Sequence, residues 1–107
     1  MKIYTVVEIL ETNEIFAEVI DVEAFSDIKK AFERMNTKYC QMLDTIESTY
    51  KDSETFYVEK YIDNYSAEIH VYPYGIDNED DYIVHTYSID EVRVREQNEN
   101  FHCYSYV

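Results

Sequence analysis

One long segment with helical periodicity, set between segments with strand periodicity, limits the folds open to this chain. In residues 26–50, SDIKKAFERMNTKYCQMLDTIESTY, apolar side chains recur every three or four residues, which predicts one apolar stripe on a helix of about 24 residues. The stripe comprises Ile28, Phe32, Met35, Tyr39, Met42 and Ile46, and it is widened by Leu43 and Tyr50. The same spacing also fits a short coiled-coil seam. Because a lone helix between strand segments normally covers their sheet, we expect the stripe to pack on a sheet.

The sequence also predicts how this helix begins and how Cys40 within it packs. Ser26 is the expected N-cap, and Asp27 suits the positive end of the helix dipole. Cys40 lies within the helix and is expected to pack as a small apolar side chain.

The segments on both sides of the helix have the composition of β-strands. Residues 2–10 and 15–22 are rich in β-branched and aromatic side chains, and the polar residues 11–14 between them predict a hairpin turn. After the helix, residues 55–62 and 65–72 alternate apolar and polar side chains around a turn at 63–64. This second hairpin should therefore have one apolar face and one face of tyrosine, carboxylate and histidine.

The C-terminal third completes the expected sheet. Pro73 and Gly75 end the second hairpin, the acidic residues 77–81 form a loop, and residues 81–95 predict one long or two short strands. The tail NFHCYSYV could add a last edge strand. We expect one domain over residues 1–107 with an α+β fold, an antiparallel sheet of about five strands in the order β-β-α-β-β-β, and the helix on one face.

The net charge of the chain limits the classes of partner that it can bind. The net charge is −14, and residues 55–91 alone carry a net charge of −8. Direct binding to nucleic acid or to an anionic membrane surface is disfavoured, because both need a basic face. With 16% aromatic residues, including twelve tyrosines, the chain does not have the composition of a disordered acidic segment. A basic protein surface is the partner that this charge favours.

The start of the helix resembles a pattern found in small phage and mobile-element proteins. After a short N-terminal hairpin comes Phe25-Ser26-Asp27-Ile28-Lys29-Lys30-Ala31-Phe32, and in those proteins Phe-Ser followed by Ala opens a helix that packs on a sheet. The overall profile of a short, acidic, single-domain chain is also similar to anti-defence inhibitors, including anti-CRISPR proteins. The resemblance covers about the first third of the chain and implies a phage or host context and a protein target.

The motifs that carry catalysis or bind cofactors are missing from the sequence. One glycine leaves no phosphate-binding loop and no G-x-S-x-G turn. The acidic run from Asp77 fails the calcium-loop pattern, because its sixth and twelfth positions are Tyr82 and Ser88. The histidines and the two cysteines show no zinc-ligand spacing, although His70 and His85 could lie on neighbouring strands. We expect no enzyme activity, no cofactor and no metal.

The expected cellular setting follows from similar absences. Two cysteines outside any CxxC pair, no apolar run of membrane-spanning length and no signal-peptide pattern favour a cytoplasmic protein, in the host cytoplasm if it is phage-encoded.

Tyrosines and carboxylates of the second hairpin and of the segments after it form the candidate protein-binding site. Tyrosine gives a large, rigid contact with a polar tip, and carboxylates meet Arg and Lys in charge-assisted bonds. The candidate residues are Tyr57, Glu59, Tyr61, Glu68, Tyr72, Tyr74, Asp77, Glu79, Asp80, Asp81, Asp90 and Glu91. Alternate carboxylates along a strand could also imitate the phosphates of DNA. The alternative for these acids is that they keep a tyrosine-rich sheet soluble.

The leading functional hypothesis is an inhibitor that occludes a basic nucleic-acid-binding surface, such as that of a CRISPR effector or another nucleic-acid-binding protein, as a partial DNA mimic. The first alternative is a homo-oligomeric accessory or structural protein, a homodimer in the simplest case. The second alternative is a module that binds a small ligand or a metal.

Overall fold

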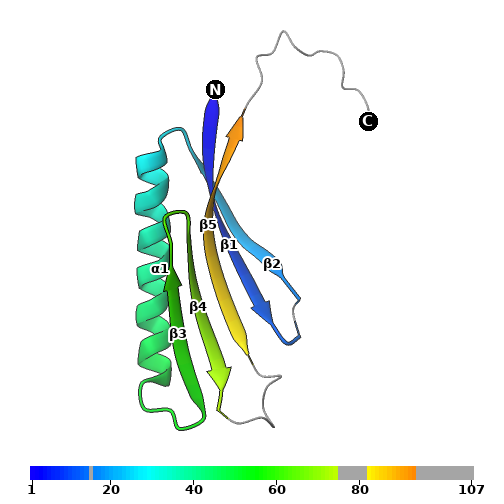
Figure 1. The fold of residues 1–107 in the computed structure, drawn as a ribbon, viewed down its shortest axis with the longest axis vertical. Coiled ribbons are helices and arrows are strands. Elements are labelled where there is room, and N and C mark those ends of the chain that lie inside the picture. The colour runs from blue at the N-terminus through cyan, green and yellow to red at the C-terminus, as the bar shows by residue number, and fades with distance from the viewer. Residues whose placement is uncertain (15, 75–81, 94–107) are drawn as a thin grey trace.

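The computed structural model describes residues 1–14, 16–74 and 82–93. The chain forms an antiparallel five-stranded sheet with one helix packed against it, which confirms the predicted α+β class and element order (Figure 1). The elements are β1 (Lys2–Thr12), β2 (Glu18–Phe25), α1 (Ile28–Tyr50), β3 (Phe56–Ile62), β4 (Ser66–Pro73) and β5 (Ile83–Arg93).

The two hairpins flank a central strand. The order in the sheet is β2-β1-β5-β4-β3, so β5 lies between the β1–β2 hairpin and the β3–β4 hairpin. β5 is one continuous strand, which settles the choice between one long strand and two short ones. It pairs along its whole length with β1, from Lys2 opposite Arg93 to Thr12 opposite Ile83, while β4 pairs only with residues 83–88.

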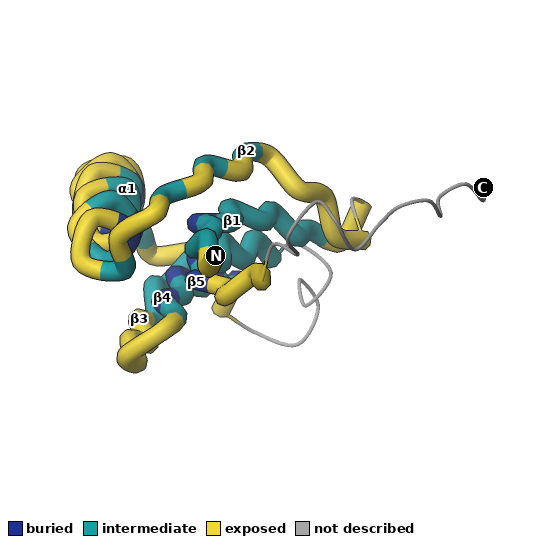
Figure 2. The backbone as a smooth tube through the Cα atoms, turned by 90° about the horizontal axis from the view of Figure 1, so that it is seen from above, coloured by how far each residue is buried: buried dark blue, intermediate teal, exposed yellow. Residues whose placement is uncertain are grey.

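The helix stripe packs on the sheet, as predicted, and forms the core with it. Ala31, Met35, Tyr39 and Ile46 are buried in α1. The stripe residues Phe32, Met42, Leu43 and Tyr50 pack against the core, and Ile28 at the start of the helix is not part of it. The buried helix residues meet Val6, Ala67, Ile69, Val71, Tyr87 and Ile89, which are the buried residues of the strands. Figure 2 looks down on the molecule from above and shows α1 on one side of a curved sheet.

Two expectations about the helix were wrong. The N-cap is Asp27, not Ser26: Asp27 has extended backbone angles, and its Oδ1 accepts a hydrogen bond from the Lys29 backbone N–H at 2.9 Å. Cys40 is exposed on the helix surface, because it follows the buried Tyr39 and therefore points about 100° away from the stripe.

β2 begins later than predicted and is irregular. β1 continues to Thr12, and β2 starts at Glu18. The register slips by one residue, because Glu8 lies opposite Asp21 while Ile9 lies opposite Val19. This β-bulge breaks the simple alternation of β2.

The β3–β4 hairpin follows its predicted alternation. Ala67, Ile69 and Val71 are buried toward α1, and the polar side chains between them face away from it. The sheet therefore has a helix side and a side turned away from α1, which we call the open face. Within the described residues, no helix has both the length and the apolar character that crossing a membrane requires.

Candidate protein-binding face

The open face of β3 and β4 carries a group of tyrosines with two glutamates and a histidine. We call this group the tyrosine–glutamate cluster, and its members are Tyr57, Glu59, Tyr61, Glu68, His70, Tyr72 and Tyr74. Antiparallel register brings the strand residues together as opposing pairs, with Tyr57 opposite Tyr72, Glu59 opposite His70, and Tyr61 opposite Glu68. On β3 the hairpin thus places Glu59 between two tyrosine rings, and on β4 it places Glu68 before the rings of His70 and Tyr72.

Ring contacts connect the aromatic members. The Tyr57 ring lies 5.7 Å from the Tyr72 ring and 5.0 Å from the Tyr74 ring, measured between centroids. Tyr61 meets His70 edge to face at 4.9 Å, and His70 lies 5.5 Å from Tyr72. These distances are typical of favourable aromatic pairs, so the rings form a continuous surface.

His70 holds the polar groups of the cluster in place. Its Nδ1 lies 2.6 Å from the Tyr72 hydroxyl, and its Nε2 lies 2.6 Å from Glu68 Oε1. The Tyr61 hydroxyl donates to Glu59 Oε2 at 2.9 Å. Both glutamates are therefore oriented by neighbours two residues away on their own strands.

Two phenols of the cluster, those of Tyr61 and Tyr72, have a raised pKa. The hydrogen bond to Glu59 raises the pKa of Tyr61 above its usual value. Burial raises the pKa of Tyr72, and the charge of Glu59 adds to the effect. These two phenols therefore remain hydrogen-bond donors and add no negative charge beside the carboxylates.

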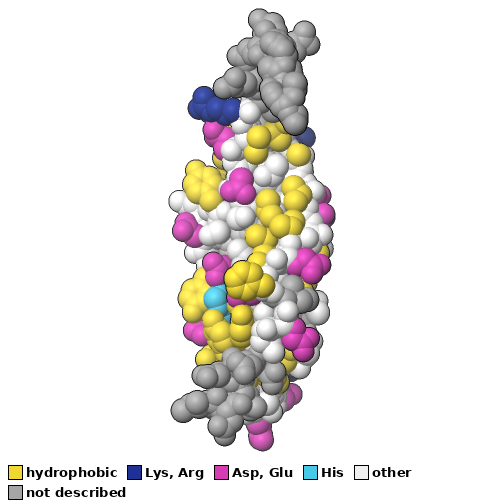
Figure 3. Space-filling model, turned by 90° about the vertical axis from the view of Figure 1, so that its right-hand side faces the viewer, with side chains coloured by type: hydrophobic (Ala, Val, Ile, Leu, Met, Phe, Trp, Pro, Cys, Tyr) yellow, Lys and Arg dark blue, Asp and Glu magenta, His cyan; other side chains and the backbone are white. Residues whose placement is uncertain are grey.

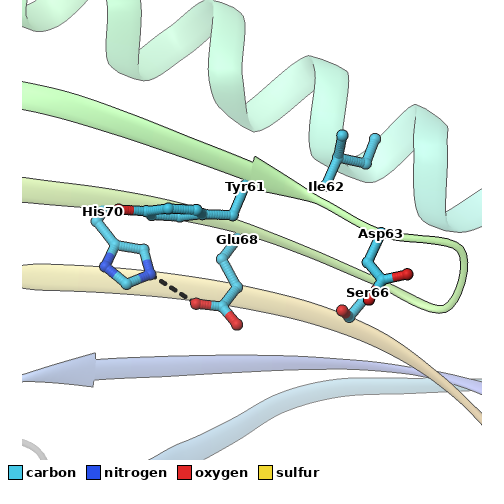
Figure 4. Close-up of a pocket in the computed structure, with 6 residues that line it drawn as sticks. All are labelled: Tyr61, Ile62, Asp63, Ser66, Glu68 and His70. Atoms are coloured by element: carbon cyan, nitrogen blue, oxygen red, sulfur yellow. Dashed lines mark hydrogen bonds and ion pairs between the residues drawn. The ribbon is translucent and has the colours of Figure 1, made fainter.

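One end of the cluster is hollowed. Tyr61, Glu68 and His70 line an open pocket of about 370 Å³ together with Ser66 and Asp63 from the hairpin turn; Ile62 completes the lining. Figure 4 shows Tyr61, Glu68 and His70 on one side of the two strands, whereas Ile62 points toward α1.

The rest of the open face combines aliphatic, hydroxyl and acidic side chains. By strand alternation Val7, Ile9 and Val84 share it, and Val19 and Val22 on β2 are 57% and 53% exposed. Its carboxylates include Glu11 and Asp90 besides those of the cluster, and Glu11 accepts a hydrogen bond from the Tyr82 hydroxyl at 3.0 Å. Figure 3 shows apolar and carboxylate side chains intermixed over the side of the molecule away from α1.

Cations of the described strands lie on the helix side. Lys60 points to α1, where its Nζ lies 3.2 Å from Glu47 Oε2. Lys2 and Arg93 lie opposite each other in the register and alternate onto the helix side. Among the described residues, then, the open face presents carboxylates with no Lys or Arg beside them.

A second polar group, between α1 and the β1–β2 hairpin, holds three further strand acids, Glu8, Asp21 and Glu23. Lys38 Nζ lies 2.6 Å from Asp21 Oδ2, 3.2 Å from Glu8 Oε1 and 3.5 Å from Glu23 Oε2. Arg34 Nε lies 2.8 Å from the same Glu23 oxygen. These acids are neutralised within the fold and are not available to a partner.

The Tyr87 hydroxyl joins this group. It donates to Glu8 Oε2 at 3.1 Å, and burial raises the pKa of Tyr87 well above its usual value. The Lys38 and Glu8 side chains are each only 12% exposed, whereas Asp21 and Glu23 are partly exposed, so this group lies at the edge of the core and has a structural role.

The structure brings together only part of the predicted site. Tyr57, Glu59, Tyr61, Glu68, Tyr72 and Tyr74 lie in one cluster. Asp90 shares the open face but lies past the end of β4, whose pairing with β5 stops at Ser88. Glu91 lies on the helix side, 3.9 Å from Lys2 Nζ, because consecutive strand residues face opposite ways. Asp77, Glu79, Asp80 and Asp81 lie outside the described residues.

His70 was not among the predicted site residues, although it links Glu68 to Tyr72. The sequence does indicate its place in the site, because His70 belongs to the polar face of a regularly alternating strand. His70 and His85 do lie on neighbouring strands, but His70 is opposite Val84 and Ile69 is opposite His85, so the two rings are on different faces. Among the described residues no group of three or more His, Cys, Asp or Glu side chains could hold a metal ion.

No similarity to a known protein informs the function of this face. No protein-family model matches the chain. No curated protein and no solved structure matches it either.

Proposed function

We propose that this protein binds a cationic surface of another protein through its open face, and that it does so without catalysis. The observation that carries the proposal is the tyrosine–glutamate cluster, where two oriented carboxylates lie among five aromatic rings on a face with no described cation. Tyrosines are favoured at interfaces because their rigid rings bury a large area at low entropic cost. The neighbouring valines add apolar area to the same face.

The target that best fits this face is a nucleic-acid-binding protein. Its binding groove presents Arg and Lys side chains spaced to meet phosphates, and the carboxylates Glu11, Glu59, Glu68 and Asp90 offer such side chains charged acceptors on one sheet. Occupying the groove would exclude nucleic acid by steric and electrostatic competition. A CRISPR effector or another defence nuclease is the sharpest form of this proposal.

A capture experiment with matched charge variants tests the proposal. The protein is immobilised as wild type, as Glu59→Lys/Glu68→Lys, and as Glu33→Lys/Asp44→Lys, whose substitutions lie on the exposed surface of α1. All three are exposed to a lysate of the source cells, and bound proteins are displaced with double-stranded DNA or heparin. Wild type and the helix variant should retain the same DNA-displaceable protein, and the cluster variant should lose it.

The two variants change net charge by the same amount, so a difference between them reports on position. Equal retention by all three proteins would refute the assignment of binding to the open face. A retained protein that DNA and heparin do not displace would refute competition with nucleic acid.

A further inference from the structure

The pocket at the end of the tyrosine–glutamate cluster has the lining of a receptor for an organic cation. Tyr61 is 49% exposed, and Glu68 lies directly opposite it in the register. Figure 4 shows the ring and the carboxylate on the same side of the hairpin, with Asp63 and Ser66 at the turn. An aromatic ring next to a carboxylate can bind one cation by a cation–π contact and an ion pair at once.

One carboxylate oxygen of Glu68 can accept a hydrogen bond from such a ligand. Its Oε1 is engaged by His70 Nε2 at 2.6 Å, which fixes the carboxylate, and its side chain is 40% exposed. No other described residue bonds to its second oxygen. Asp63 Oδ1 accepts from the Asn64 backbone N–H, and the Asp63 N–H donates to the Ser66 carbonyl at 2.8 Å, so the turn that supplies the remaining lining is held in place.

The charge of the pocket suits a positive group, and its shape suits a side chain. Two carboxylates line it, while Lys60, the cation nearest in sequence, points to the other side of the sheet. A volume of about 370 Å³ is large enough for a whole arginine side chain. Metal binding is not favoured, because the described residues include no group of ligands that could hold an ion.

We propose that this pocket receives the guanidinium group of an arginine presented by the partner. The planar group stacks on the Tyr61 ring and donates to the second oxygen of Glu68, a geometry that a lysine ammonium cannot reproduce. The assignment rests on the proposed function, since it supplies one contact of the proposed interface. It makes Tyr61 and Glu68 the residues that select arginine over other cations.

The test uses a small probe, so that it does not need the partner. Nα-acetyl-L-arginine N-methylamide is titrated into the ¹⁵N-labelled protein and followed by NMR. We expect saturable shifts confined to the β3–β4 hairpin, with millimolar affinity. The lysine analogue should bind less tightly, and the uncharged citrulline analogue should not bind.

Two variants locate the probe. Glu68→Gln and Tyr61→Leu should each weaken binding by about threefold or more, because each removes one of the two contacts. Asp44→Asn, at an exposed position of α1, is the matched control and should leave the affinity unchanged. Circular dichroism confirms that each variant is folded.

The outcomes separate this inference from the proposed function. No saturable shift, equal binding of the citrulline or lysine analogue, or unchanged affinity in both variants would overturn the arginine assignment. If the probe fails while the charge variants still abolish capture of the partner, the pocket assignment is wrong and the binding face stands. If the probe binds as expected while all charge variants capture equally, the binding face is wrong.

Discussion

At the scale of single residues, His85 is held in surroundings that oppose its protonation. Burial lowers its pKa below the usual value, and the charge of Glu8, which acts in the opposite direction, is the smaller effect. Its neighbours across the sheet are Leu10 on β1 and Ile69 on β4. Its Nδ1 is buried and bonds to no described residue. The folded state therefore binds a proton at His85 less readily than the unfolded chain does.

The stability contributed by a lowered histidine pKa is present at high pH and lost in acid. As the pH falls through 6.5, the ordinary pKa of histidine, the unfolded chain takes up a proton that the folded chain does not bind, so the free energy of unfolding falls. We predict that His85→Leu flattens the fall in thermal stability between pH 7.5 and pH 5, because it removes this linkage. At pH 7.5 the variant should gain about 1 kcal/mol, since a buried nitrogen without a partner is replaced by an apolar group.

His70→Leu is the matched control for this prediction. It also removes a histidine, but one that lies on the adjacent strand and on the opposite face of the sheet. The control should keep the acid loss that His85 causes. A pH profile of His85→Leu that parallels the wild type would contradict the prediction.

The difference between these two histidines also shows what residue patterns can predict. Each has a tyrosine two positions away, so the local sequence treats them alike. Their faces are decided by the register of β4 on β5, which is a long-range choice. Alternation within one hairpin, in contrast, correctly placed Tyr57, Glu59 and Tyr61 on one face, because that choice depends only on neighbouring residues.

At the scale of secondary-structure elements, Lys38 fastens α1 to the β1–β2 hairpin. It reaches Glu8 on β1 and Asp21 and Glu23 on β2. Its hydrogen bonds to Asp21 and Glu8 outweigh the effect of burial and leave the pKa of Lys38 above its usual value, and the same contact lowers the pKa of Asp21. Stability from this contact is thus lost at alkaline pH as Lys38 deprotonates and in acid as Asp21 protonates.

We predict that Lys38→Met lowers the free energy of unfolding by about 2 kcal/mol in urea titration. The value lies below the 3–5 kcal/mol typical of a fully buried pair, because Asp21 and Glu23 are partly exposed. Adding Glu8→Gln should restore part of the loss, since the amide oxygen can still accept from Tyr87.

Lys30→Met, at an exposed position of the same helix, controls for the loss of a positive charge and should change stability by less than about 0.5 kcal/mol. Equal effects of Lys38→Met and Lys30→Met would show that the contacts of Lys38 contribute nothing.

The elements themselves were largely predictable, and their ends were not. Strand-like composition or two-residue alternation identified each strand, and the 3.6-residue period identified the helix. The delayed start of β2 and its bulge opposite Glu8 and Ile9 were not predictable, because both faces of residues 15–22 are apolar and the alternation carries no information there. The acids of β2 acquire their role only when α1 brings Arg34 and Lys38 to them.

At the scale of the whole molecule, the arrangement of strands separates charge between the two sides of the sheet. The pairing of β1 with β5 joins residues about 80 positions apart, so the strand order could not be predicted from local pattern. That order places Glu11 and Asp90 on the same face as the tyrosine–glutamate cluster. Two cations of α1, Arg34 and Lys38, lie on the other side and pair with strand acids there.

This separation predicts how salt affects the fold. With a net charge of −14, and with open-face carboxylates that have no cation beside them, repulsion among unpaired acids should outweigh the attraction in the ion pairs. Raising NaCl from about 20 mM to about 0.5 M screens both, because the Debye length falls from roughly 20 Å to about 4 Å. We predict that the midpoint of thermal unfolding rises by about 5 °C, which corresponds to roughly 1 kcal/mol for a domain of this size.

The variant Glu59→Gln/Glu68→Gln isolates the contribution of the open face. Because it removes two of the unpaired charges and keeps the shape of the side chains, its unfolding midpoint should be higher than that of wild type at low salt and should rise less as NaCl is added. Chloride is the appropriate anion, since sulfate stabilises folded proteins by exclusion from their surface and would obscure the electrostatic effect. A midpoint that falls with NaCl in the wild type would mean that the ion pairs around Lys38 outweigh the repulsion, and that the open face is not the site of electrostatic strain inferred from its carboxylates.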